Sequence, residues 1–133
     1  MIVLDASAAI ALLLRTNQSH SIEERVFAPD ERVHAPALVD LEIVQVLCRF
    51  VRSGAMSSER ARESLDVWTG LPVRRHGHDA LLDRIWALRE NLTAYDAAYV
   101  ALAEALDAPL LTCDAKLVVT GGHAARIEMV GAA

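Results

Sequence analysis

The sequence has few of the residues that cross-link or interrupt a chain. Among its 133 residues there are only two Cys, four Pro and six Gly. Cys48 and Cys113 lie far apart in apolar stretches, where an unpaired thiol behaves as a small hydrophobic side chain. A disulfide-stabilised secreted scaffold is therefore disfavoured, and we expect a cytoplasmic location.

Aromatic residues are also scarce, at 5%, although 53% of the residues are hydrophobic and Ala, Leu and Val are abundant. This much apolar surface excludes a disordered chain, because burying it offsets the loss of conformational entropy. An aliphatic core suits helices packed on a parallel sheet. The length fits one hydrophobic core, so we predict a single domain over residues 1–133.

No hydrophobic run is long enough to span a bilayer. The apolar run at residues 2–14 is interrupted by Asp5, follows no Lys or Arg, and falls short of the roughly 20 residues that a membrane helix needs. We therefore expect no signal peptide, no membrane anchor and no membrane partner.

Basic charge is in the minority, with 13 basic against 18 acidic residues and a net charge of −5. This balance does not favour a general polyanion-binding surface. Carboxylates that bind a metal ion are counted here as bare negative charges, however, and the bound cation reverses their local sign. A nucleic-acid substrate is therefore not excluded.

Short β-favouring runs alternate with helical segments along the whole chain. We predict strands at residues 2–4, 32–35, 71–75, 110–112 and 126–130. We predict helices at residues 6–15, 21–28, 36–52, 57–69 and 80–90, and a last helix that begins with the capping box at residues 93–96 and ends at residue 106. The helix starts are placed by Ser21 and Thr93 at capping-box spacing, by Pro36 in a first turn, and by Ser57 or Ser58 as an N-cap. The alternation predicts an α/β fold, a three-layer α/β/α sandwich with a central parallel sheet of about five short strands.

Four acidic residues occupy positions that this fold would bring to one edge of the sheet. Asp5 ends the first strand, and Asp114 follows the late strand two residues after Thr112. Asp96 stands in the first turn of its helix, and Glu42 interrupts an otherwise apolar helix, where a charge needs a partner. Ligands of open α/β sheets gather at the carboxyl ends of the strands, so we expect these acids to form one cluster.

A cluster of carboxylate oxygens selects hard cations, so we predict Mg2+ as the cofactor, with Mn2+ as a substitute, rather than Zn2+. Such an ion relieves the repulsion among the acids, acidifies a water molecule and stabilises charge on a phosphate. The chemistry that this suits best is phosphodiester hydrolysis. Ser7 and Thr112 lie two residues from Asp5 and Asp114, and we assign their hydroxyls to support of the site or to phosphate contacts.

Each acid taken alone also has a purely structural interpretation. Asp5 is a suitable helix cap, Asp96 completes a capping box, Asp114 suits a turn, and Glu42 fits a solvated notch. The nearby Asp40 is expected to be solvated. The prediction of a site depends on the four acids occurring together at matched positions.

The chain resembles the PIN-domain ribonucleases, and in particular the VapC toxins of bacterial toxin–antitoxin pairs. The resemblance rests on residues 2–8, 41–43, 92–103 and 110–114. It implies a Mg2+-dependent endoribonuclease that acts on RNA, a small cognate antitoxin that neutralises it, and a homodimer. The positions that match the family's acidic ligands are Asp5, Glu42, Asp96 and Asp114, and those that match its accessory hydroxyls are Ser7 and Thr112. Cys113 departs from the family, which often has another small residue there.

Two other functions remain as alternatives. A catalytically silent PIN-fold module that binds a partner protein would not need all four acids. A phosphoryl-transfer domain of the receiver or haloacid-phosphatase type is disfavoured, because no acid flanks Asp5 and Ser7 stands where the phosphatases have a second Asp.

Several other features are interpreted as structural. We expect the His76–Gly77–His78 segment to be a surface turn, and Trp68 and Trp86 to pack in the core. The helices at residues 36–70 carry more hydrophobic residues than one sheet face covers, so we predict that they form the dimer contact and a groove for the antitoxin.

Overall fold

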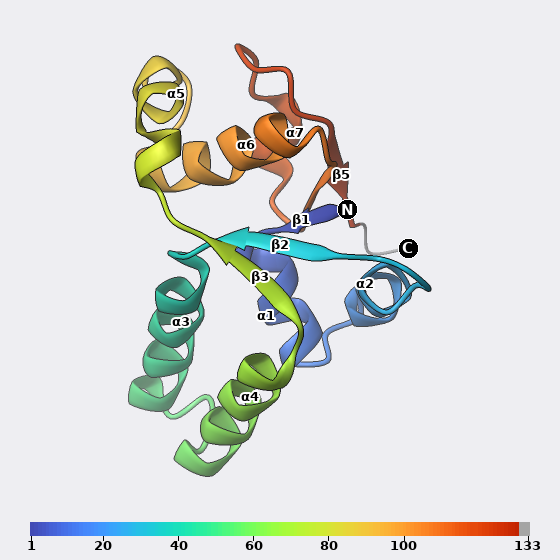
Figure 1. Ribbon diagram of the computed structural model, residues 1–133. Helices are drawn as coiled ribbons and strands as arrows, with labels where there is room; N and C mark the ends of the chain where they lie inside the picture. Colours follow the sequence, from blue (N-terminus) through green and yellow to red (C-terminus); the bar gives the residue numbers. More distant parts are fainter. Residues whose placement is uncertain (131–133) are drawn as a thin grey trace.

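Five short strands form one parallel sheet at the centre of the molecule (Figure 1). The structure is a computed structural model and describes residues 1–130. The strands are β1 (Ile2–Leu4), β2 (Val33–Pro36), β3 (Val73–His76), β4 (Leu110–Thr112) and β5 (Ile127–Met129). Their order is β3-β2-β1-β4-β5, and every neighbouring pair is parallel. The predicted parallel sheet is therefore confirmed.

Helices cover both faces of the sheet and complete the three layers. One face carries α1 (Ala6–Leu13), α2 (Ser19–Val26), α3 (Val39–Ser53) and α4 (Ser58–Gly70). The other carries the 3-10 turn η1 (Asp79–Leu81), α5 (Leu82–Ala87), α6 (Ala94–Leu106) and α7 (Ala115–Val119). Within residues 1–130, no helix is both long and apolar enough to cross a membrane.

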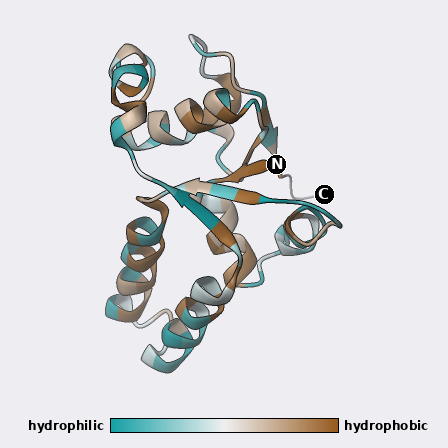
Figure 2. Ribbon diagram, viewed as in Figure 1, coloured by the Kyte–Doolittle hydropathy of each residue, from teal (hydrophilic) through white to brown (hydrophobic). Residues whose placement is uncertain are grey.

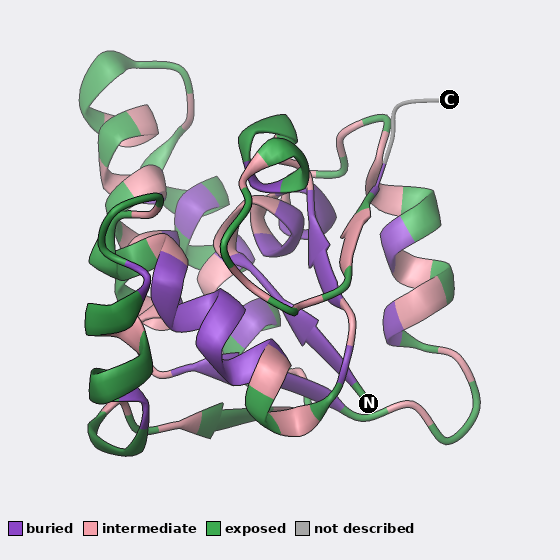
Figure 3. Cartoon of the chain, turned by 90° about the horizontal axis from the view of Figure 1, so that it is seen from above, coloured by how far each residue is buried: buried purple, intermediate pink, exposed green. Residues whose placement is uncertain are grey.

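The core lies around β1, β4 and α6. All three residues of β1 and of β4 are buried, and so is the continuous run 97–103 in α6 (Figure 3). Four of these seven α6 residues are Ala, whose small side chains let the helix lie close to β1, β2 and β4. Hydrophobic residues gather where the layers meet, and polar ones on the outer helix faces (Figure 2). The position of α6 is thus held by burial along most of its length.

The sheet register brings the ends of β1 and β4 together. Val3 pairs with Leu110 and Leu4 with Leu111. The Asp5 N–H then donates to the Leu111 carbonyl at 3.2 Å. Because the strands are parallel, the residues that follow each of them share the same edge of the sheet.

The predicted start of α3 at Pro36 is wrong. Pro36 is the last residue of β2 and pairs with His76 of β3, and α3 begins only at Val39. The pairing of β2 with β1 reaches no further than His34, so the N–H that Pro36 lacks removes no hydrogen bond on that side. The next residue, Ala37, donates its N–H to the His76 carbonyl at 2.8 Å and continues the extended path.

Other helix boundaries also differ from the prediction. Helix α2 begins at Ser19 after Gln18, with no side-chain cap, so Ser21 lies inside the helix and does not cap it. Helix α1 ends two residues before Arg15, whose φ of 54° is left-handed and cannot continue a helix. Ser57, one of the two predicted caps, does accept the Arg60 N–H at 3.1 Å.

Candidate functional site

Asp5 is the most enclosed of the four predicted acids, with 4% of its surface exposed. It is the N-cap of α1, and its Oδ1 accepts the Ala8 N–H at 2.9 Å and the Ser7 hydroxyl at 2.6 Å. Its Oδ2 accepts the hydroxyl of the fully buried Thr112. The capping role is therefore real, and it also fixes the carboxylate at the end of β1.

Ser7 and Thr112 tie this carboxylate to the end of β4. The Ser7 hydroxyl accepts the Cys113 N–H, and the Thr112 hydroxyl accepts the Asp114 N–H, both at 2.9 Å. The two hydroxyl oxygens are 3.3 Å apart. Because both hydroxyls also bond to Asp5, their geometry favours holding that acid over contacting a phosphate.

Asp96 and Asp114 stand where helices begin. Asp96 lies in the first turn of α6, where its N–H donates to the Thr93 hydroxyl at 3.2 Å, so the predicted cap at Thr93 is confirmed. Asp114 is the N-cap of α7, a short helix that we did not predict, and its Oδ1 accepts the Lys116 N–H at 3.0 Å. Both acids are partly buried.

Glu42 has a partner that the sequence analysis missed. The hydroxyl of Tyr99 in α6 donates to Glu42 Oε1 at 2.5 Å across the two layers of helices. Tyr99 is 2% exposed and follows Asp96 by three residues, so both face the same side of α6. Tyr99 follows Asp96, an acid in the first turn of α6, by three residues, and this spacing is the sequence signal that could have identified Tyr99 as part of the site.

The four acids lie close enough for the charge of one to affect the pKa of another. Burial raises the pKa of Asp5, and the charge of Asp114 raises it further, although hydrogen bonds to the carboxylate offset part of the shift. Burial likewise raises the pKa of Glu42, with repulsion from Asp96 and Asp5 adding to it and the hydrogen bond from Tyr99 opposing it. The pKa of Asp96 is raised by burial and by Asp114. Asp5, Glu42 and Asp96 are thus each close enough to another acid of the group for its charge to oppose their ionisation.

In the part of the chain that the structure describes, no basic side chain forms an ion pair with this group. Residues 1–130 contain eight ion pairs, and none of them includes Asp5, Glu42, Asp96 or Asp114. Lys116 lowers the pKa of Asp96 through its charge, but only as the smallest of four influences. Unpaired carboxylates in a half-buried setting favour a bound cation, and a donor set of oxygens alone suits Mg2+ or Mn2+.

The acids do not form a closed set of ligands. Across residues 1–130, no three His, Cys, Asp or Glu side chains are arranged closely enough to hold one metal ion. Asp5 is held by three hydrogen bonds, whereas Asp96 and Asp114 are partly exposed at helix starts. A cation at this edge would therefore require the more exposed acids to turn toward it.

The histidines near β3 have internal partners. His34 Nδ1 and His76 Nε2 are 2.8 Å apart, and His78 Nε2 accepts the Leu38 N–H at 3.1 Å. His76 belongs to β3, so the predicted surface turn begins only after it. These contacts fasten β2, β3 and the start of α3 to one another.

Two further expectations about polar and aromatic residues are wrong. Asp40 is not simply solvated, because it pairs with Arg75 at 2.8 Å and accepts the Trp68 indole N–H at 2.7 Å. Trp68 is fully buried as predicted, but Trp86 is 68% exposed. Helix α5 turns its Trp86 face away from the core.

Comparisons with known proteins identify the family of the chain. The PIN domain family model matches residues 2–122. A VapC ribonuclease of Mycobacterium bovis is 44% identical over 130 residues, which cover 98% of each chain. Ribonuclease VapC12 of Mycobacterium tuberculosis is 41% identical and covers 98% of this chain and 99% of its own. These matches confirm the resemblance inferred from the residue patterns.

Solved structures share the fold. The VapBC2 structure of Rickettsia felis, bound to a DNA fragment from its promoter, superposes with a TM-score of 0.71 at 16% identity, covering 97% of this chain and 98% of that one. PAE2754 of Pyrobaculum aerophilum superposes with a TM-score of 0.67 at 25% identity, covering 95% and 81%.

Proposed function

This chain belongs to the PIN-domain family, and from that premise we propose that it is a Mg2+-dependent endoribonuclease of the VapC type, a toxin controlled by a small cognate antitoxin. The observation that carries the proposal is the group of four mutually repelling carboxylates at one sheet edge, none of them in an ion pair. Relatives that match 98% of this chain are named ribonucleases, which supports RNA as the substrate.

Asp5, Glu42, Asp96 and Asp114 are the residues that would hold the cation. Bound Mg2+, or Mn2+ in its place, would acidify a water molecule and stabilise the charge of a phosphate oxygen during hydrolysis. Charge repulsion within this group of carboxylates fits the role of a cation site, because a bound divalent cation offsets the electrostatic cost of ionising them together.

The remaining residues of the site act by positioning. Thr112 and Ser7 hold Asp5 through both of its oxygens, so this ligand needs little reorganisation when a cation binds. The buried Tyr99 holds Glu42 through one of its oxygens, Oε1. Asp96 remains more exposed and can turn toward the cation and the RNA.

The apolar groove between α3 and α4 is our candidate for the antitoxin. It has a volume of about 340 Å³, and hydrophobic side chains line most of it, together with Arg52 and Arg62. Such a groove suits an amphipathic peptide that carries acidic residues. We propose the same pair of helices for the contact between two copies of the chain.

The cleavage test compares wild type with Asp96→Ala on total RNA in the presence of Mg2+ or Mn2+. Wild type should cut the RNA, and the variant should not, while circular dichroism shows that both are folded. Equal cleavage by the two proteins would reject the assignment of Asp96, and a folded wild type that cuts no RNA would favour the catalytically silent binding module. Sequencing the RNA ends after brief induction would also identify the target.

The toxin role has a separate test in cells. Expression of the chain alone should arrest growth, and co-expression of a small protein encoded beside it should restore growth. A Val51→Asp substitution in the α3–α4 groove should weaken that rescue without reducing RNA cleavage. Harmless overexpression of a folded, active enzyme would contradict the toxin role.

A further inference from the structure

Helix α5 carries exposed apolar side chains that the core does not account for. Leu82 and Trp86 are four residues apart, so they share one face of the helix, and they are 57% and 68% exposed. The other tryptophan of the chain, Trp68, is fully buried. Leu82 and Trp86 together leave contiguous apolar surface on this helix face, which is the kind of surface that marks a binding site.

A groove runs from this face to the start of α6. Its volume is about 470 Å³, and it is lined by Leu82, Asp83, Ile85, Trp86, Arg89 and Ala94. Ala94 is the first residue of α6 and stands two positions before Asp96. The groove therefore opens beside the helix start that carries one of the four acids.

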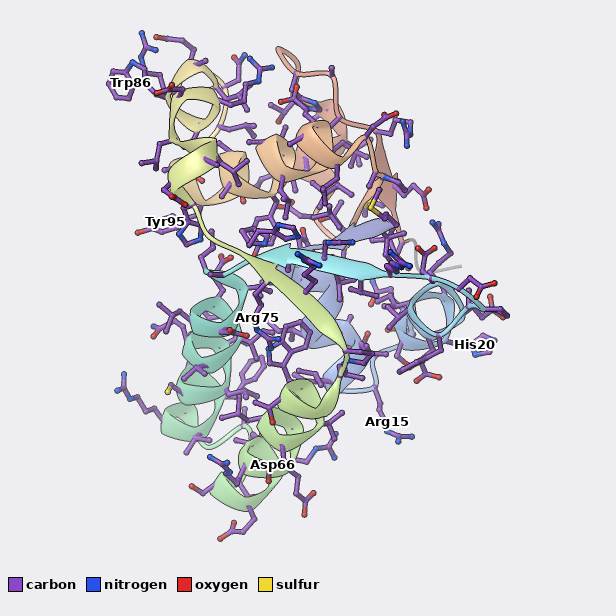
Figure 4. All side chains as sticks on the ribbon, viewed as in Figure 1. Arg15, His20, Asp66, Arg75, Trp86 and Tyr95 are labelled. Atoms are coloured by element: carbon purple, nitrogen blue, oxygen red, sulfur yellow. The ribbon has the colours of Figure 1, made fainter. Side chains whose placement is uncertain are left out.

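Tyr95, between Ala94 and Asp96 in the chain, is 67% exposed. Figure 4 shows Tyr95 and Trp86 pointing outward on the same side of the molecule, one from the start of α6 and one from α5. Two exposed aromatic rings, Trp86 and Tyr95, thus lie near the groove and near Asp96.

Arg89 gives the groove a positive charge beside an aromatic surface. Its guanidinium lies 4.5 Å from the centre of the Trp86 ring, and its Nη1 donates to the Trp86 carbonyl at 3.1 Å. Its contact with Glu90 is long, at 3.8 Å. Arg84, within α5, is different, because its Nε and Nη2 donate to the two carboxylate oxygens of Glu104. Arg89 therefore keeps donors available for an outside partner.

We propose that this α5–α6 groove binds an unpaired nucleobase of the RNA substrate, adjacent to the cleaved phosphate. Trp86 stacks on the base, Arg89 contacts the neighbouring phosphate, and Asp83 can accept a hydrogen bond from an exocyclic amino group. The proposal rests on the proposed ribonuclease function and names the residues that read the substrate. An aromatic ring with a free Arg, beside acids that act on phosphodiesters, fits single-stranded RNA better than a second protein chain.

The test compares Trp86→Ala and Trp86→Phe with wild type on a short single-stranded RNA that the wild type cleaves. Loss of one stacked base should raise KM roughly 5- to 150-fold with kcat little changed. The Phe variant should retain most of the affinity, because it keeps an aromatic ring. Phe27→Ala is the matched control. Phe27 is 59% exposed and directly follows α2, which lies on the other face of the sheet from α5, so this variant should leave KM unchanged.

A second readout does not depend on cleavage. Trp86 is the only exposed tryptophan of the chain, so acrylamide quenching of its fluorescence reports whether the ring is covered. In the Asp96→Asn protein, adding the RNA should protect Trp86 from acrylamide. This separates the two proposals, because protection without any cleavage by the wild type would refute the proposed function alone.

Two results would overturn the groove proposal. The first is an unchanged KM for Trp86→Ala together with no protection of Trp86 by RNA. The second is a Trp86→Ala protein that sediments as a monomer where the wild type is a dimer, which would assign this surface to a second copy of the chain.

Discussion

Thr112→Val should isolate the contribution of one hydroxyl to the acidic site. Thr112 is fully buried, and its hydroxyl donates to Asp5 while accepting the Asp114 N–H. Valine keeps the shape of the side chain but removes both bonds. Losing a buried hydrogen bond to a charged group costs about 1.5–3 kcal/mol, so we expect a fall of roughly 5–15 °C in Tm at neutral pH.

The pH dependence of this loss gives a sharper check. The pKa of Asp5 is already raised above its ordinary value of 3.8 by burial, and the Thr112 hydrogen bond lowers it by favouring the carboxylate. Removing the bond raises that pKa further. The deficit of the variant should therefore be small at acid pH, where Asp5 is protonated in both proteins, and grow as the pH rises to neutrality.

Urea unfolding of the metal-free proteins across this pH range measures the effect. Thr69→Val is the matched control, because Thr69 is exposed and its hydroxyl bonds only to the Asp66 carbonyl. A Thr112→Val deficit that stays constant with pH, or that equals the control, would refute the reasoning.

Two other perturbations probe the same site. Tyr99→Phe removes the hydrogen bond to Glu42 and raises the pKa of that carboxyl, so the acid limb of the RNA-cleavage profile should move to higher pH; an unchanged profile would exclude the positioning role. Because Asp5, Glu42 and Asp96 all have raised pKa values, the metal-free protein should lose their contribution to stability as pH rises from about 4. Saturation with Mn2+ at one hundred times its Kd should restore about 2.7 kcal/mol at neutral pH and little in acid, measured by calorimetry; a metal effect that is independent of pH would contradict this.

The sequence predicts the sheet and most of its edge because local patterns determine them. Asp5 follows a short β-favouring run and begins a helix, and both roles are readable from adjacent residues. The same holds for Thr93, whose spacing to Asp96 predicts the start of α6 correctly. Positions defined by a strand end or a helix cap need no knowledge of distant contacts.

Tertiary contacts explain what the sequence could not predict. Pro36 suits a first helical turn, yet pairing with His76, forty residues away, keeps it in β2. Tyr99 and Glu42 are 57 residues apart in the chain, so no local pattern in the sequence indicates that they are in contact. Trp86 follows helical periodicity, but which face of the six-residue α5 meets the core depends on how that helix packs against α6.

Manganese binding tests the central claim most directly, because it measures whether the four carboxylates act together on one cation. Electron paramagnetic resonance of free Mn2+ should show binding to the wild type and at least roughly tenfold weaker binding to Asp96→Asn, as expected when a site loses one of its carboxylates. Asp66→Asn, an exposed acid on α4, should bind like the wild type. A wild type that binds no Mn2+, or an Asp96→Asn protein that binds it equally well, would contradict the account.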